Sequence, residues 1–299
     1  MKKTSKNILF HINGGLGKCC MFTAVLRNYK LAHPDDKCVV VSGYPEVFVN
    51  NPDVERFFPF AQGYLWQDYY GNPDWKVIAT DPYLENEWIK NHDKHLIQVW
   101  SEMLGVPYVV KESQMWFSSA EVDEINSMVI TDKPVMFVQS TGGSNPAARS
   151  WTRNAPQPEL EEFLAKFTDH YRLHVAMPGT PVLQNVDQRV ETFSRRQCLL
   201  LAYYCSSAVL IDSYGLHCRS GCPFPQKTYV FFPLTEMRHR VGYNKEGHEY
   251  ILPRPEIQEM LKTHSDYYGT LLKFSLEDLG ENCPVPPGIK WFDTEKIGV

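Results

Sequence analysis

The sequence predicts an α/β protein with two domains, each built on a doubly wound parallel β-sheet. The chain has 299 residues, which is long for one compact domain and sufficient for two that each bury a core. Short apolar runs of the kind that form buried parallel strands alternate with segments of helical periodicity. This alternation stops in a polar stretch and then starts again. We therefore expect a first domain of residues 1–132 and a second of residues 133–299.

The first half opens with a strand, a glycine turn and a helix. The apolar run from Asn7 to Ile12 predicts the strand, and the turn Gly14-Gly15-Leu16-Gly17 follows it at once. Apolar residues at helical spacing predict a helix over 18–31, and a second strand is expected over 38–41. The other elements expected here are a short helix at 44–48, a strand at 56–60, loops and short helices over 61–95, and a helix at 95–104.

The second half repeats the alternation. Its first strand is predicted over 135–139, directly after a polar stretch. The elements expected after it are helices at 158–171, at 195–205 and after His217, and strands at 173–177, 208–211 and 228–232. Two halves of this kind predict two Rossmann-like domains that face each other across a cleft.

Composition narrows the class of protein. The formal charge of −5 lacks the basic footprint expected of a protein that holds nucleic acid mainly through its phosphates. The sequence contains no run of about 18 apolar residues, so it does not predict a membrane-spanning helix. Scattered cysteines and the lack of an apolar secretion segment favour a reducing cytoplasm. Cys218 and Cys222 lack the spacing and the second ligand pair of a zinc site, so we expect no metal.

The glycine turn is the first candidate site. Gly14, Gly15 and Gly17 allow close backbone approach, and the helix start offers unpaired N–H groups to an anion or a sugar hydroxyl. The spacing matches neither a dinucleotide site nor a P-loop, although Lys18 follows, so hydride and phosphoryl transfer are disfavoured. A tight turn without a ligand is the alternative interpretation.

Two loops of the second half are further candidates. The strand at 135–139 ends in Ser140, Thr141 and Gly142, at the sheet edge where α/β folds bind ligands. Arg149 follows on the same connection, and its guanidinium is suited to clamp a diphosphate. The second loop follows the strand at 208–211 and contains Asp212, Ser213, Tyr214, Gly215 and His217. The alternative interpretation of Arg149 is a solvated loop charge. The alternative for the second loop is a helix cap made by Asp212 or Ser213.

Taken in order, these motifs resemble the ADP-heptose:lipopolysaccharide heptosyltransferase family over most of the chain. The resemblance implies a GT-B fold and an inverting sugar transfer that needs no metal and no cofactor besides a nucleotide-sugar substrate. It also implies that the C-terminal domain holds the nucleotide-sugar and the N-terminal domain holds the acceptor. The motifs that carry it are Gly14-Gly15-Leu16-Gly17, His33-Pro34-Asp35, Asn51-Pro52-Asp53-Val54, Arg149-Ser150-Trp151, Asp212-Ser213 with His217, and Phe232-Pro233-Leu234-Thr235.

Matched to the family, Thr141 and Arg149 would hold the donor phosphates, with Arg149 where the family usually has lysine. The segment from Asp212 to His217 would line the same diphosphate. The glycine of the family's Asp-Ser-Gly pattern comes one residue late, at Gly215. Lys18 stands where heptosyltransferases have the aspartate thought to deprotonate the acceptor, and a protonated lysine cannot act as that base.

A replacement base is therefore expected in the N-terminal domain, while Lys18 could bind the donor diphosphate or an anionic acceptor. The leading function is sugar transfer to a glycan such as a lipopolysaccharide core. Transfer to a hydroxymethylated base of phage DNA, a non-catalytic nucleotide-sugar-binding protein and a nucleotide-sugar epimerase are the alternatives. The sugar, the nucleobase and the oligomeric state stay open. The candidate bases are Asp68, Asp81, Glu85, His92 and His11, and the predicted catalytic residues are Lys18, Asp81 and His11.

Overall fold

The computed structural model describes residues 5–85, 87–142, 153–235, 237–262, 285–286 and 288–298. The chain divides into two compact units, residues 1–123 and 124–299. The domain boundary predicted from the sequence, between residues 132 and 133, lies further along the chain, after helix α5 (Ser119–Met128). Each unit contains one parallel sheet with helices packed on it, so the predicted α/β class is confirmed.

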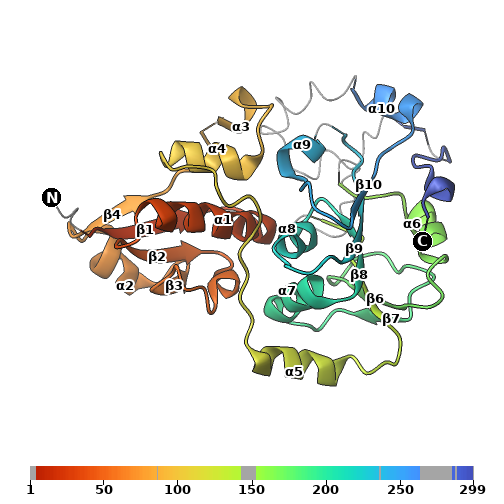
Figure 1. Cartoon of the computed structure of the whole chain (residues 1–299), viewed down its shortest axis with the longest axis horizontal. Helices are drawn as coiled ribbons and strands as arrows, with labels where there is room; N and C mark the ends of the chain where they lie inside the picture. Colours follow the sequence, from red (N-terminus) through yellow and green to blue (C-terminus); the bar gives the residue numbers. More distant parts are fainter. Residues whose placement is uncertain are drawn as a thin grey trace. The chain divides into compact units, whose positions relative to one another are not determined.

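The N-terminal unit is built on a four-stranded parallel sheet with the order β3-β2-β1-β4 (Figure 1). Leu9 and Phe10 of β1 are fully buried, which suits a central strand with both faces covered. The chain moves from β1 to β3 on one side and then crosses to β4 on the other, so the order reverses between β1 and β4. The elements are β1 (Asn7–Ile12), α1 (Leu16–Ala32), β2 (Lys37–Ser42), the 3₁₀-helix η1 (Pro45–Phe48), β3 (Arg56–Pro59), α2 (Gly63–Leu65), the π-helix η2 (Trp66–Tyr70), β4 (Trp75–Ile78), α3 (Glu87–Lys90) and α4 (Leu96–Met103).

The two faces of this sheet are covered differently. On one face, Phe22 of α1 packs against Phe10 of β1 and Trp100 of α4, with ring centroids 5.4 and 4.9 Å apart. On the other face, Leu65 and Tyr69 from the short α2–η2 segment pack on the sheet. A short aromatic segment therefore takes the place of a long second-layer helix.

The C-terminal unit is built on a six-stranded parallel sheet with the order β10-β9-β8-β5-β6-β7 (Figure 1). Its strand order reverses between β5 and β8. Crevices at such reversals, outside the carboxyl ends of the strands, are where open α/β sheets bind ligands. The elements are β5 (Val135–Val138), α6 (Gln157–Leu164), β6 (Tyr171–Val175), β7 (Gln188–Val190), α7 (Arg195–Tyr204), β8 (Ser207–Ile211), α8 (Tyr214–Ser220), β9 (Lys227–Phe231), α9 (Met237–Val241), β10 (His248–Ile251), α10 (Pro255–Lys262) and the 3₁₀-helix η4 (Thr294–Lys296).

Most elements expected from the sequence are present within two residues of their predicted ends. Three predictions were wrong. Strand β4 lies in the segment 61–95, which was expected to hold only loops and short helices. Helix α6 ends at Leu164 instead of residue 171, because Tyr171 already begins β6. Helix α8 begins at Tyr214, so His217 lies inside the helix and not before it.

Three general findings concern the described residues. None of their helices is long and apolar enough to cross a membrane. Their seven cysteines are buried and carry free thiols. They contain no group of three or more histidine, cysteine, aspartate or glutamate residues arranged to hold a metal ion.

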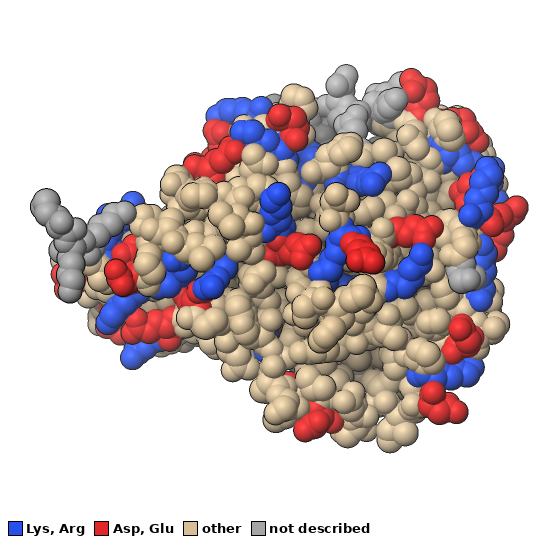
Figure 2. Space-filling view, viewed as in Figure 1, with Lys and Arg blue, Asp and Glu red and all other residues tan. Residues whose placement is uncertain are grey.

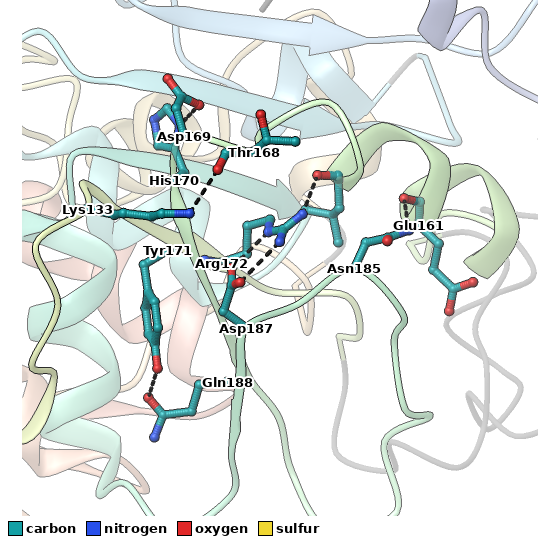
Figure 3. Close-up of polar contacts among 11 residues, drawn as sticks. Lys133, Glu161, Thr168, Asp169, His170, Tyr171, Arg172, Asn185, Asp187 and Gln188 are labelled. Carbon is teal, nitrogen blue, oxygen red and sulfur yellow. Dashed lines mark hydrogen bonds and ion pairs between the residues drawn. The ribbon is translucent and has the colours of Figure 1, made fainter.

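The amino-terminal edge of the C-terminal sheet is held by an ion pair between β6 and the residue before β7 (Figure 3). Arg172 Nε donates to Asp187 Oδ2 at 2.8 Å, and Nη2 donates to Oδ1 at 3.1 Å. The hydroxyl of Tyr171 donates to the side chain of Gln188 at 3.0 Å on the same strands. The Arg172 guanidinium lowers the pKa of the Asp187 carboxyl below its usual value. These contacts lie at the edge opposite to the carboxyl ends of the strands.

Replacing Arg172 with alanine is expected to lower the free energy of unfolding by about 1 kcal/mol, since the two side chains are 15% and 28% exposed and such pairs contribute little. Because the pKa of Asp187 is lowered on folding, this contribution is present above about pH 4 and is lost as the pH falls further. A double-mutant cycle with Asp187→Ala, measured by urea unfolding at pH 7 and pH 3, checks both statements. A coupling energy that is equal at the two pH values would contradict them.

Candidate functional site

At the carboxyl edge of the N-terminal sheet, an ion pair joins the two strands between which the order reverses. Lys18, in the first turn of α1 after β1, places its Nζ 2.8 Å from Oδ2 of Asp81, which follows β4. The side chains are only 14% and 4% exposed. Oδ1 of Asp81 accepts from the backbone N–H groups of Tyr83 at 2.9 Å and Leu84 at 3.5 Å. Two of the three predicted catalytic residues are therefore in direct contact.

The glycine turn has the backbone shape that this ion pair requires. Gly14 has a φ of +108°, and a Cβ added to it would lie 2.7 Å from the Cε of Lys18. The lysine side chain thus lies directly across the turn, with its ammonium 4.6 Å from the centre of the Tyr83 ring. Gly15 is exposed and Gly17 is partly buried, so the turn is open to a ligand beside a positive charge.

His11, the third predicted catalytic residue, uses both of its ring nitrogens. Nδ1 bonds to the hydroxyl of Tyr70, and Nε2 lies 3.2 Å from Oδ1 of Asn13. An amide oxygen only accepts, so Nε2 carries the proton and Nδ1 accepts from Tyr70. The lone pair that a general base would need is already occupied by the Tyr70 hydroxyl.

In the C-terminal unit, one side chain joins the two predicted donor loops. Gln139, directly after β5, donates through Nε2 to Ser213 Oγ at 3.0 Å and to the carbonyl of Thr141 at 3.4 Å. Its Oε1 accepts from the backbone N–H of Gly215 at 3.1 Å. A Cβ on residue 215 would lie 2.6 Å from that oxygen, so any larger residue there would displace the Gln139 side chain. We call these contacts the Gln139 clasp, and they hold the loops after β5 and β8 side by side at the reversal point.

The loop after β5 is also anchored on its other side. Ser140 Oγ lies 2.9 Å from Nε2 of His174 in β6, and the hydroxyls of Thr141 and Thr180 lie 3.4 Å apart. The backbone N–H of Gly142 donates to Asn154 Oδ1 at 3.1 Å. Burial lowers the pKa of His174 to about 4, so its imidazole is neutral at neutral pH. The first residues of the loop, 140–142, are thus each held by a hydrogen bond or hydroxyl contact, and Thr141 remains partly exposed.

The loop after β8 contains a buried acid, Asp212, which lies near His217 and Arg153. His217 Nε2 lies 3.7 Å from Oδ1 of Asp212, and its Nδ1 lies 3.0 Å from the hydroxyl of Tyr243. Burial alone would raise the pKa of Asp212, but the imidazole of His217 and the charge of Arg153 outweigh it and lower the pKa. Asp212 is therefore a carboxylate held inside the protein. Ser213 and Tyr214 are partly exposed beside it.

Arg149, which the sequence assigned to the donor phosphates, lies outside the described residues, as do Ser150 and Trp151 of its motif. Arg153, on the same connection, is described and lies close enough to Asp212 to affect its pKa. A hollow of about 500 Å³ in this unit is lined by Met128 and residues 188–193. None of the predicted site residues lines it, so the candidate site is defined by the loops at the reversal points.

No protein-family model and no curated protein matches this chain. Solved structures do. Escherichia coli ADP-heptose lipopolysaccharide heptosyltransferase II is 12% identical with a TM-score of 0.63, over 89% of this chain and 99% of that one. A glycosyl transferase family 9 protein from Veillonella parvula is 11% identical with a TM-score of 0.61, over 93% and 96%. The chain has the GT-B fold of the heptosyltransferases. Escherichia coli heptosyltransferase WaaC with ADP is similar too, at 10% identity and a TM-score of 0.55, over 89% and 99%.

The heptosyltransferase resemblance predicted from short motifs is thus confirmed for the fold. Gln139, His174 and Tyr243 are among the site residues that were not predicted. Gln139 and His174 lie within predicted strands, where a polar residue among apolar neighbours was the available signal. Tyr243 carries no such signal, since it lies in a loop between α9 and β10.

The Gln139 clasp can be tested with Gly215→Ala. The added methyl group would meet Gln139 Oε1, so the variant is expected to lower the free energy of unfolding by about 1–3 kcal/mol. Urea unfolding measures this, with Gly63→Ala as the control because a Cβ there has no neighbour within 4 Å. Equal stability of the two variants would show that the clasp does not constrain residue 215.

His174 is expected to make the protein less stable in acid. Between about pH 6.5 and 4 the unfolded chain binds a proton at residue 174 and the folded chain does not, so stability falls as the pH falls. His174→Gln keeps a hydrogen-bonding side chain and removes this loss, which amounts to at most about 1.4 kcal/mol per pH unit. Unfolding curves measured from pH 7 to 4 check this, with the exposed His92→Gln as the control. Parallel pH profiles of the wild type and His174→Gln would contradict it.

Proposed function

We propose that this protein is a glycosyltransferase that moves a sugar from a nucleotide diphosphate sugar to a hydroxyl of a glycan acceptor, with inversion and without a metal. The observation that carries the proposal is the pair of clasped loops at the reversal point of the C-terminal sheet. They present small hydroxyl and glycine residues at the edge where such sheets hold ligands. The heptosyltransferase fold supports the same conclusion.

The donor is assigned to these two loops. Thr141 and Ser213 offer partly exposed hydroxyls that can donate to phosphate oxygens. Arg153 supplies positive charge near Asp212, and Arg149 remains a further proposed phosphate ligand. The buried carboxylate of Asp212 orients His217 within this arrangement and does not itself face the diphosphate as an exposed charge. Hydrogen-bond donors and positive charges that are already in position stabilise the charge that develops on a departing diphosphate.

The catalytic base is assigned to Asp81. It is a carboxylate at the reversal point of the N-terminal sheet, 2.8 Å from the lysine that occupies the usual position of the base. A carboxylate has about four lone-pair positions, and Lys18 and the Tyr83 and Leu84 N–H groups use three. Lys18 therefore orients the carboxylate and leaves it capacity to accept the proton of an acceptor hydroxyl. His11 is a poorer candidate because both of its nitrogens are engaged.

The reaction is a single displacement. The acceptor oxygen forms a bond to the anomeric carbon while the bond from that carbon to the diphosphate oxygen breaks. The acceptor proton passes to Asp81, and the electron pair leaves with the nucleoside diphosphate. One displacement inverts the configuration at the anomeric carbon.

On the face in Figure 2, lysines and arginines lie among aspartates and glutamates, which favours a glycan over DNA as the acceptor.

Asp81→Asn is expected to lower the rate of transfer by about 10²–10⁴-fold, because the amide has the shape of the acid and cannot accept the proton. Donor affinity should stay unchanged, since the donor loops belong to the other unit. The measurement is turnover and binding with a panel of nucleotide sugars and neutral glycan acceptors. Asp187→Asn, at the opposite edge of the C-terminal sheet, is the control for removing a carboxylate.

Two results would contradict the proposal. If the wild type bound nucleotide sugars but transferred none to any acceptor, the protein would be a binding protein and not an enzyme. If Asp81→Asn retained the full rate, the base would be another residue and the assignment of Asp81 would be wrong.

A further inference from the structure

Four rings of the N-terminal unit form a continuous series, which we call the aromatic row: Phe60, His11, Tyr70 and Trp66. Phe60 stacks on His11 with centroids 5.0 Å apart and planes at 25°. Tyr70 meets the His11 ring edge-on at 5.7 Å, and Trp66 stacks on Tyr70 at 6.1 Å and 19°. His11 is the last residue but one of β1, so the aromatic row passes close to the glycine turn.

The aromatic row is partly buried except at its last ring. Phe60, His11 and Tyr70 are partly buried, whereas Trp66 is 70% exposed. Single exposed apolar residues are common, but Trp66 continues a row of contacting rings, and contiguous exposed apolar surface marks binding sites. The row therefore ends in an open aromatic face that leads from solvent to the candidate site.

The packing of the sheet does not require Trp66. Leu65 and Tyr69, four residues apart, cover the sheet, while Trp66 and Tyr70, also four apart, stack on one another. The N–H of Gly71 donates to the carbonyl of Trp66 at 2.8 Å, which closes a turn of π-helix. π-Helical turns are rare and occur frequently at functional sites.

The charge around the aromatic row selects among ligands. Residues 61–85 contain four acidic residues and one basic residue, and the nearby Lys18 is already paired with Asp81. A phosphate-rich or carboxylate-rich ligand would be repelled here, and nucleic acid needs several basic contacts to its phosphates. An uncharged sugar ring fits, because its C–H face packs on an aromatic ring and its hydroxyls bond to polar side chains. Gln67 and Asp68, directly after Trp66, are exposed.

We infer that the aromatic row is the acceptor subsite and that an uncharged pyranose ring of a glycan packs on Trp66. The inference rests on the proposed function where it calls this sugar the acceptor. Binding of the ring itself does not depend on sugar transfer. If Trp66 holds this sugar, the acceptor is a neutral glycan and not a phosphorylated one.

The first test measures sugar binding to the full chain by saturation-transfer NMR. The probes are the methyl glycosides of glucose, galactose, mannose and N-acetylglucosamine. Trp66→Ala is expected to weaken binding of the preferred glycoside about tenfold, and Trp66→Phe should restore part of the loss. Phe224→Ala is the control, since that ring is 58% exposed and lies in the C-terminal unit.

The inference would be overturned if the wild type and Trp66→Ala bound the glycosides equally well. It would also be overturned if the wild type bound no neutral glycoside. Trp66-dependent binding of glucuronate or of an oligodeoxynucleotide in place of neutral glycosides would assign the row to an anionic ligand. A Trp66-dependent dimer in sedimentation experiments would assign it to a second copy of the chain.

The second test separates this inference from the proposed function. In a transfer assay, Trp66→Ala should raise the acceptor KM about tenfold and leave hydrolysis of the nucleotide sugar by water unchanged. An unchanged acceptor KM in an active enzyme would overturn the subsite alone. Trp66-dependent glycoside binding by a protein without turnover would support the subsite and contradict the proposed function alone.

Discussion

The side-chain amide of Gln139 holds the C-terminal candidate site together. Its nitrogen and oxygen bond to both loops at the point where the strand order reverses, and Gly215 must lack a Cβ for this approach. A buried amide is costly unless its hydrogen bonds are made, so the loops after β5 and β8 cannot move apart cheaply. Gln139 therefore contributes directly to the positions of Thr141 and Ser213, on which diphosphate binding would depend.

An ion pair plays the corresponding part in the N-terminal unit. Lys18 from the start of α1 and Asp81 from the loop after β4 meet across the reversal between β1 and β4. A cation in the first turn of a helix is unfavourable beside the positive end of the helix dipole. The Asp81 carboxylate offsets that cost and brings a negative charge to the same place. The ion pair explains how a lysine can occupy the first turn of α1 and how a carboxylate is still present beside it.

The sequence predicted the strands with continuous apolar runs, such as β1, β2 and β8, because burial on both faces leaves that pattern. It missed β4, a sheet-edge strand in which none of the four residues is fully buried and which lies among aromatic loop residues. The site was predicted as separate loops. Its joining contacts could not be predicted, because Gln139 and Ser213 are 74 residues apart and Lys18 and Asp81 are 63 apart. Only the three-dimensional fold brings such partners together.

The aromatic segment shows how one stretch of chain serves both the fold and the surface. A short segment that covers a sheet needs a few large side chains on one side, and Leu65 and Tyr69 meet that need. Tyr70 packs against the same core cluster, but Trp66 stacks on Tyr70 from the solvent side, where a charged or small residue would be equally compatible with the helix. The hydrogen bond from Tyr70 to His11 then fixes the outer rings to the end of β1. Packing of the sheet therefore accounts for Tyr70 but not for the exposed ring of Trp66, which the proposed acceptor subsite would explain.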